Sequence, residues 1–182
     1  YLVNQGTIAF HVWGSHVPSA EVPDYVLFDL DPGSAPFPQV IALAQALRQA
    51  LEKQGHAVYV KTSGKSGLHL LVPWRRGGGW NEARAFATEI GKQVIAERPE
   101  LSTLEIRKER RGGKIYLDVM QNVRGHHVVP AYVVRAVPSA TVSMPLSWDE
   151  VRDDLDPRRF TTEVALSRVA ARGDLLAGLH AP

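Results

Sequence analysis

Two aspartates, Asp29 and Asp31, close a short apolar stretch that begins at Tyr25. Side chains alternate along a strand, so residues two positions apart point to the same face of a sheet. Two carboxylates on one face repel each other in a low dielectric unless a positive charge lies between them. Because the chain has no cysteine, oxygen ligands and hence Mg²⁺ or Mn²⁺ are favoured. The alternative is that one aspartate caps the following helix while the other forms a salt bridge.

A third aspartate, Asp118, interrupts an apolar stretch between Leu117 and Val119. Burying a carboxylate is costly unless it is paired or bound to a metal, although an amphipathic strand would turn Asp118 outward to water. Asp29 and Asp31 would then supply two carboxylates from one strand, and Asp118 would supply a third from another strand. That layout is typical of a two-metal phosphoryl-transfer site.

The segment 61–69 reads Lys-Thr-Ser-Gly-Lys-Ser-Gly-Leu-His and joins two expected strands. Its hydroxyls, its central lysine and the amides exposed by its glycines are typical of a phosphate cradle. It is not a Walker motif, because no glycine lies five residues before Gly64 and no helix follows. A polar hairpin turn, with His69 as an ordinary sheet histidine, is the alternative interpretation.

Further polar residues flank the Asp118 strand. Gln121 follows that strand directly, and Arg135 lies on the next expected strand. A basic segment precedes the Asp118 strand, and it is either a solvated loop or the edge of the same cleft. Its cations are Arg107, Lys108, Arg110, Arg111 and Lys114.

The elements that would position these residues follow from hydrophobic periodicity and turn chemistry. Strands are expected over residues 7–13, 25–30, 57–61, 68–73, 114–121 and 128–137. Helices are expected over residues 37–54 and 81–97, after a capping box at Ser147, and from Thr161 or Thr162 to about Gly173. The order predicts an α+β fold with a mixed, largely antiparallel sheet and flanking helices.

Length and composition set the outer limits. The chain has 182 residues, a formal net charge of +2, 45% hydrophobic and 22% charged residues, and a pI near 9.0. These values exclude disorder, collagen and coiled coil as the dominant class, and no apolar stretch is long enough to span a membrane. We expect one domain over residues 1–182 without a secretory signal, cut from a longer chain or in a mature form, since it begins at Tyr1.

Taken together, these motifs resemble the polymerase domain of bacterial DNA ligase D, in the archaeo-eukaryotic primase superfamily, which serves non-homologous end joining. The resemblance runs nearly from end to end and keeps the order and spacing of the motifs. The matching stretches are Asn4-Gln5-Gly6 with His11 and Trp13, Phe28-Asp29-Leu30-Asp31-Pro32-Gly33, Lys61-Thr62-Ser63-Gly64 with Gly67-Leu68-His69, Leu117-Asp118-Val119-Met120-Gln121-Asn122, Ala131-Tyr132 with Val134-Arg135, and the tail from Pro145 to Thr161.

The resemblance implies a primase-type, RRM-like catalytic core and a metal-dependent nucleotidyltransferase. Such an enzyme adds nucleotides, preferably ribonucleotides, to DNA 3′ ends with Mg²⁺ or Mn²⁺ as cofactor. It implies that Asp29, Asp31 and Asp118 are the catalytic metal ligands. It also implies a nucleoside-triphosphate site formed by Ser63, Lys65, His69, His11, Gln121 and Arg135. The expected partners are a nucleoside triphosphate, DNA ends, a ligase and end-binding repair proteins, in the cytoplasm and nucleoid of a bacterium or archaeon.

Two departures from the family pattern affect these expectations. In many relatives the loop lysine stands at the position of Ser66, and the family domain is longer by about a third on its N-terminal side. That part carries the lysines that bind a DNA 5′-phosphate. The cations left to bind DNA are Arg107, Lys108, Arg110, Arg111 and Lys114. We therefore expect this chain to bind DNA ends weakly, with little preference for a 5′-phosphate, and to extend primers poorly or not at all. The alternatives are a catalytically weak or inactive module that binds DNA ends and nucleotides, and a small-molecule Mg²⁺ phosphohydrolase that shares the carboxylates.

Overall fold

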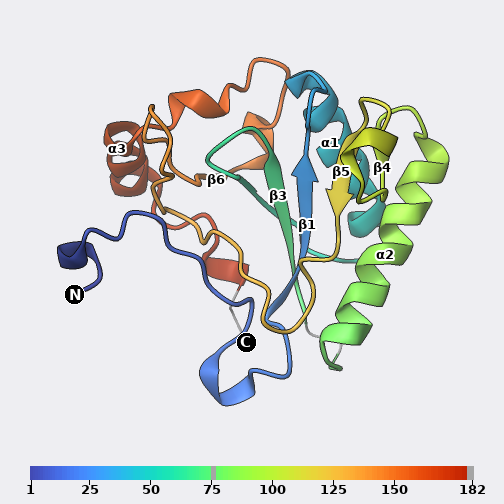
Figure 1. Cartoon of the computed structure of the whole chain (residues 1–182), viewed down its shortest axis with the longest axis horizontal. Helices are drawn as coiled ribbons and strands as arrows, with labels where there is room; N and C mark the ends of the chain where they lie inside the picture. The colour runs from blue at the N-terminus through green and yellow to red at the C-terminus, as the bar shows by residue number, and fades with distance from the viewer. Residues whose placement is uncertain (75–76, 180–182) are drawn as a thin grey trace.

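A computed structural model describes residues 1–74 and 77–179 of the chain. Within these residues a six-stranded sheet has the strand order β4-β5-β1-β3-β2-β6 (Figure 1). Every pairing in it is antiparallel except the one between β4 and β5. The strands are β1 (Tyr25–Asp31), β2 (Tyr59–Thr62), β3 (Leu68–Pro73), β4 (Ser102–Thr103), β5 (Ile115–Asp118) and β6 (Pro145–Leu146). This architecture confirms the expected α+β class with a largely antiparallel sheet.

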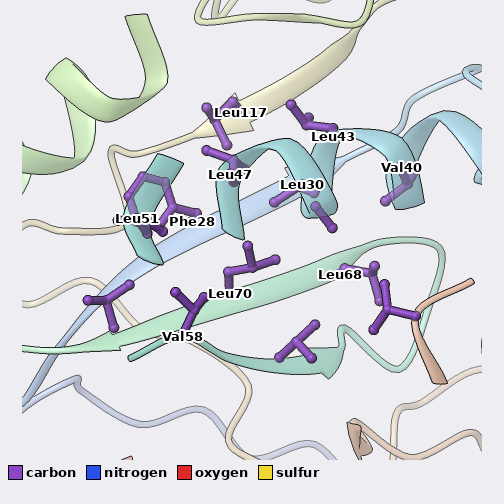
Figure 2. Close-up of a cluster of buried hydrophobic side chains, with 14 of the residues drawn as sticks. Phe28, Leu30, Val40, Leu43, Leu47, Leu51, Val58, Leu68, Leu70 and Leu117 are labelled. Atoms are coloured by element: carbon purple, nitrogen blue, oxygen red, sulfur yellow. The ribbon is translucent and has the colours of Figure 1, made fainter. Parts of the chain in front are cut away.

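Three α-helices accompany the sheet in the described residues: α1 (Phe37–Lys53), α2 (Trp80–Glu97) and α3 (Thr162–Arg172). The first of them follows the predicted helical spacing. Val40, Leu43, Leu47 and Leu51 are all buried, and Figure 2 shows them between the helix and the strands beneath it. Gly55, at φ +81°, ends the helix in the left-handed conformation that glycine adopts without strain. None of the described helices is long and apolar enough to cross a membrane.

Alternation along the strands divides the sheet into two chemically different faces. On β1, Val26, Phe28 and Leu30 belong to the buried apolar cluster. Figure 2 shows Phe28 and Leu30 on the side of the strand that faces α1. Asp29 and Asp31 have the opposite parity and therefore lie on the face away from the helices. The same parity places Lys61 of β2 and His69 of β3 on that second face.

Two of the predicted strands do not form. Residues 7–13 contribute a single backbone pairing, between Val12 and Val128, because no partner runs alongside them for more than one residue. Residues 128–137 are equally irregular. Tyr132 adopts φ +63°, which breaks the extended chain, and Pro130 has no N–H to donate.

Several boundaries also differ from the sequence expectation. The second helix begins at Trp80 with Gly79 as its N-cap, so Asn81 is not the cap. Strand β5 ends at Asp118 rather than at Gln121, and the short strands β4 and β6 were not expected. The capping box between Ser147 and Glu150 is confirmed, but it opens a single 3₁₀ turn. The N-cap of α3 is Thr161, which was one of the two predicted positions. Its hydroxyl accepts a hydrogen bond from the Val164 amide.

Candidate active site

A row of four polar residues crosses the sheet on the face away from the helices. Asp29 lies opposite Asp118 in the pairing of β1 with β5, and opposite His69 in the pairing of β1 with β3. His69 in turn lies opposite Lys61 in the pairing of β3 with β2. Residues directly opposite each other on one face have Cβ atoms about 5 Å apart, so each side chain in this row can reach the next.

The position of Asp29 in this row disfavours the charged form of its carboxyl group. Burial raises its pKa to about 7, and the neighbouring Asp118 and Asp31 carboxylates act in the same direction. Lys61 and Arg135 oppose the shift without cancelling it. One Asp29 oxygen, Oδ1, lies 3.5 Å from Nε2 of His69, and a quarter of the side chain remains exposed. The raised pKa of Asp29 therefore reflects its burial first and the two neighbouring carboxylates second.

The carboxylate of Asp118 is fixed by three donors. Its Oδ1 accepts from the Tyr116 hydroxyl at 3.2 Å and from the Met120 amide at 2.9 Å. Its Oδ2 accepts from Nε2 of Gln121 at 3.1 Å. Gln121, predicted to contact the nucleotide, thus positions one of the predicted metal ligands.

Asp31 is paired with an arginine from the basic segment. Nη1 of Arg111 lies 3.1 Å from Oδ2 of Asp31, and the guanidinium stacks 4.1 Å above the Tyr116 ring. The carbonyl oxygens of Glu105 and Ile106 accept from its other nitrogens. Arg111 is therefore a well-held internal cation, unlike a mobile surface arginine.

The loop between β2 and β3 is held in one shape by its own serine. Oγ of Ser63 accepts from the amides of Lys65 at 3.2 Å and Gly67 at 3.1 Å. Nη1 of Arg135 donates to the Ser63 carbonyl at 3.2 Å. A side chain at Gly64 would collide with Arg135, and its φ of +72° also requires glycine. The loop and Arg135 thus form one rigid edge beside the carboxylates.

Lys61 is buried beneath this edge with its ammonium among three partners. Nζ lies 2.7 Å from Oγ of Ser143, 2.9 Å from Nδ1 of His69 and 3.0 Å from the Val129 carbonyl oxygen. Burial lowers the pKa of Lys61, and the Asp29 carboxylate opposes that shift. Burial also lowers the pKa of His69 well below its ordinary value, and the charge of Lys61 adds to that effect.

The three aspartates, the Ser63 loop, His69 and Arg135 line one cleft of about 460 Å³, and Lys61 lies behind its wall. All three predicted metal ligands face it, and so do all the predicted nucleotide-binding residues: Ser63, Lys65, His69, His11, Gln121 and Arg135. His11 reaches it from the irregular N-terminal segment, where burial and the neighbouring side chains of Arg135, His127 and Lys65 lower its pKa. Of the five cations predicted to bind DNA, Arg111 lines the cleft, whereas Arg107, Lys108, Arg110 and Lys114 are not among the described lining residues.

The donor set suits a hard divalent cation, because carboxylate oxygens are the ligands that Mg²⁺ and Mn²⁺ prefer. Burial is the main cause of the raised pKa of Asp29, and the carboxylates of Asp118 and Asp31 add to it by repulsion that such a cation would relieve. Within residues 1–74 and 77–179, however, no three histidine, aspartate or glutamate side chains already form a ready-made metal site. Arg111 holds Asp31, so a cation would compete with that guanidinium for the carboxylate.

Sequence reasoning did not single out Tyr116 or His127, and it quoted Lys61 and Asn122 within longer motifs without giving either a role of its own. Tyr116 and His127 line the cleft, Lys61 lies behind His69, and Asn122 ties the segment after β5 to β1. The buried Asn122 amide accepts from the Leu27 amide at 2.8 Å and donates to the Leu27 carbonyl at 2.7 Å. The sequence did offer a signal for Lys61, because it is a lone charged residue in an expected apolar strand. The same reasoning selected Asp118.

Comparison with known proteins gives a consistent result. The family described as the LigD primase-polymerase domain matches residues 1–176. A multifunctional non-homologous end joining protein LigD of Pseudomonas aeruginosa is 36% identical over 177 residues, which is 97% of this chain. A bifunctional non-homologous end joining protein LigD of Bacillus subtilis is 32% identical over 95% of this chain.

The solved polymerase domain of Mycobacterium tuberculosis ligase D, in complex with DNA, superimposes on the whole chain. The TM-score is 0.90 at 28% sequence identity, and this chain covers 67% of that structure. The chain spans 21% of the P. aeruginosa relative and 28% of the B. subtilis relative. The similarity is thus to the polymerase portion of much longer proteins.

Proposed function

The chain belongs to the LigD primase-polymerase domain family, and from that premise we propose that it transfers nucleotides to DNA 3′ ends in non-homologous end joining. The family is one of nucleotidyltransferases. The finer parts of the proposal are the dependence on Mg²⁺ or Mn²⁺ and the preference for ribonucleotides. As in the relatives, a primer 3′-hydroxyl would attack the α-phosphate of a nucleoside triphosphate, and pyrophosphate would leave.

One observation carries the proposal: three aspartates from two paired strands face the same cleft as the Ser63 loop, His69 and Arg135. Carboxylates alone would fit many metal enzymes. A rigid cationic edge beside them supplies what a triphosphate needs, namely donors and positive charge on the side away from the acids. A phosphohydrolase that acts on a small molecule would not need that second, cationic edge.

Asp29, Asp31 and Asp118 would hold the divalent cations, which neutralise triphosphate charge and lower the pKa of the attacking hydroxyl. The residues of the chain have separate tasks. Gln121 and Tyr116 keep the Asp118 carboxylate oriented toward the cleft. Lys65 and Arg135 would bind phosphate oxygens, and the bonds of Ser63 to the loop amides keep the loop from collapsing into the cleft.

A second candidate is a module that binds DNA ends or nucleotides with little or no catalysis. The observation in its favour is Arg111, whose guanidinium is held by two carbonyl oxygens and the Tyr116 ring while it pairs with Asp31. A cation that binds all three carboxylates would compete with that guanidinium for Asp31. The two candidates differ in whether primer extension accompanies the binding of metal and nucleotide.

Two measurements test the proposal. Primer extension with Mn²⁺ and ribonucleotides should be weak for the wild type and lost in Asp29→Asn and Asp118→Asn, while Asp153→Asn, at an exposed position, serves as the matched control. Calorimetry should show Mn²⁺ binding with nucleotide in the wild type that the double variant Asp29→Ala, Asp31→Ala lacks. Metal and nucleotide binding without extension would favour the binding module, and equal metal binding by both proteins would refute the assignment of the carboxylates.

The partners and location follow from the same proposal. DNA ends would be the substrate, since the superimposed M. tuberculosis domain was solved with DNA. A ligase and end-binding repair proteins would act beside it in the bacterial cytoplasm and nucleoid, as the relatives' description as end-joining proteins suggests. The extent of the domain over residues 1–182, and the shorter N-terminal side, remain predictions.

A further inference from the structure

Behind the cleft, Lys61 is a buried lysine that the proposed chemistry does not use. Its side chain is 2% exposed, and it lies on β2 directly opposite His69. A buried ammonium is costly unless every one of its protons is bound. For Lys61 to stay charged, each proton of its ammonium group therefore needs an acceptor among its neighbours.

In its charged form, which the neighbouring Asp29 carboxylate favours, Lys61 has three protons and three acceptors. The Val129 carbonyl, at 3.0 Å, can only accept. Oγ of Ser143, at 2.7 Å, has one proton of its own and donates it to the Thr62 carbonyl at 2.8 Å, so it also accepts from Lys61. The third proton is left for Nδ1 of His69 at 2.9 Å.

This count determines which nitrogen of His69 carries a proton. If Nδ1 accepts from Lys61, the proton of the neutral imidazole resides on Nε2. Nε2 is the nitrogen nearer the cleft, 3.5 Å from Oδ1 of Asp29. The opposite tautomer would aim a lone pair at that carboxylate and leave one proton of the ammonium without an acceptor.

We propose that Lys61 is a positioning residue that holds His69 in the Nε2–H tautomer, with its donor directed into the cleft. His69 is 4% exposed and lines the cleft, so one fixed N–H can serve a phosphate oxygen without any rearrangement. This consequence for nucleotide binding rests on the proposed function, whereas the tautomer itself does not. The role resembles that of residues behind a metal-bound histidine, which fix its tautomer and ring orientation.

Nitrogen-15 NMR of the nucleotide-free chain tests the tautomer directly. Long-range proton–nitrogen correlations of His69 should show a proton on Nε2 and a hydrogen-bonded, unprotonated Nδ1. In Lys61→Met, which keeps the chain length but removes the donor, the Nδ1 resonance should move and the second tautomer should appear. Lys53→Met, at an exposed position near the end of α1, should leave the His69 signals unchanged.

A wild-type spectrum with the proton on Nδ1 would overturn the proposal, and so would His69 signals that are the same in Lys61→Met as in the wild type. The wild-type spectrum decides between tautomers even where Lys61→Met does not fold, and Lys61→Gln then provides a shorter, uncharged donor for comparison.

Nucleotide affinity supplies the functional readout. We expect Lys61→Met to weaken the binding of a nucleoside triphosphate with Mn²⁺ by about tenfold, as for other residues that orient a ligating histidine. Unchanged affinity would overturn the positioning role. Failure of the wild type itself to bind nucleotide would instead count against the proposed function, while the spectra would still decide the tautomer.

Discussion

Replacing Asp29 with asparagine should remove a pH-dependent instability from the metal-free protein. The pKa of Asp29 is raised from 3.8 to about 7, so the folded state retains a proton that the unfolded chain has released between those values. Raising the pH through this window therefore favours unfolding. A shift of that size corresponds to ~4 kcal/mol, and since a quarter of the side chain is exposed to water, we expect about half of it, ~2 kcal/mol.

The expected result is a difference between the two proteins that depends on pH. Asp29→Asn should match the wild type within ~0.5 kcal/mol at about pH 4 and exceed its unfolding free energy by ~2 kcal/mol at about pH 8. Urea titration in excess EDTA, followed by the fluorescence of the four tryptophans, measures both values. The groups that face Asp29 are present in both proteins: Asp118, Asp31, Lys61, Arg135 and His69.

A stability difference that is the same at both pH values would refute the reasoning, because it would mean that Asp29 titrates alike in the folded and unfolded chains. Asp153→Asn, at an exposed position, controls for the loss of one negative charge. Addition of Mn²⁺ at the higher pH should stabilise the wild type and have less effect on Asp29→Asn, since a cation relieves the same repulsion that the amide removes.

Three further changes have outcomes that the structure determines. Gly64→Ala should cost about 2–3 kcal/mol in thermal unfolding, because φ is +72° and the new Cβ would lie 2.9 Å from the Ser143 amide nitrogen, whereas Gly112→Ala, at φ +58° in open space, should cost about 1 kcal/mol. Asn122→Ala should lower the unfolding free energy by about 2–4 kcal/mol, since it leaves two buried backbone groups of Leu27 without partners, and a loss below 1 kcal/mol would contradict this. Removing three exposed cations should reduce the salt dependence of DNA-end binding by roughly 3 units of log K against log salt, measured by fluorescence anisotropy at several salt concentrations, and an unchanged slope would place the DNA elsewhere. Those three are Arg107, Lys108 and Arg110.

Arg111 differs from the cations beside it in sequence. The basic segment 107–114 was predicted as one DNA-binding group, yet Arg111 alone pairs with a cleft carboxylate and stacks on Tyr116. Composition and proximity in sequence cannot separate such residues, because the distinction depends on where the chain after β4 passes β5. The DNA role of the whole group stays a prediction.

Local sequence patterns determined those elements of this protein that depend on interactions between residues close together in the sequence. The helical spacing from Val40 to Leu51 predicted α1, which begins at Phe37 as expected and ends one residue early at Lys53. The apolar stretch after Tyr25 predicted β1, and alternation alone placed Asp29 and Asp31 on one face. These features depend on hydrogen bonds and side-chain directions within a few residues, so they can be recognised without knowing the partner segment.

The tertiary structure decided everything that depends on a partner distant in sequence. The alternation of residues 7–13 looked like a strand, but a strand needs a neighbour along its length and only Val12 has one in the described chain. The register that sets Asp29 opposite both Asp118 and His69, and Lys61 behind His69, follows from pairing between segments up to about ninety residues apart. Sequence chemistry therefore identified which residues could form a site, whereas strand pairing determined that they do meet and that a buried lysine stands behind them.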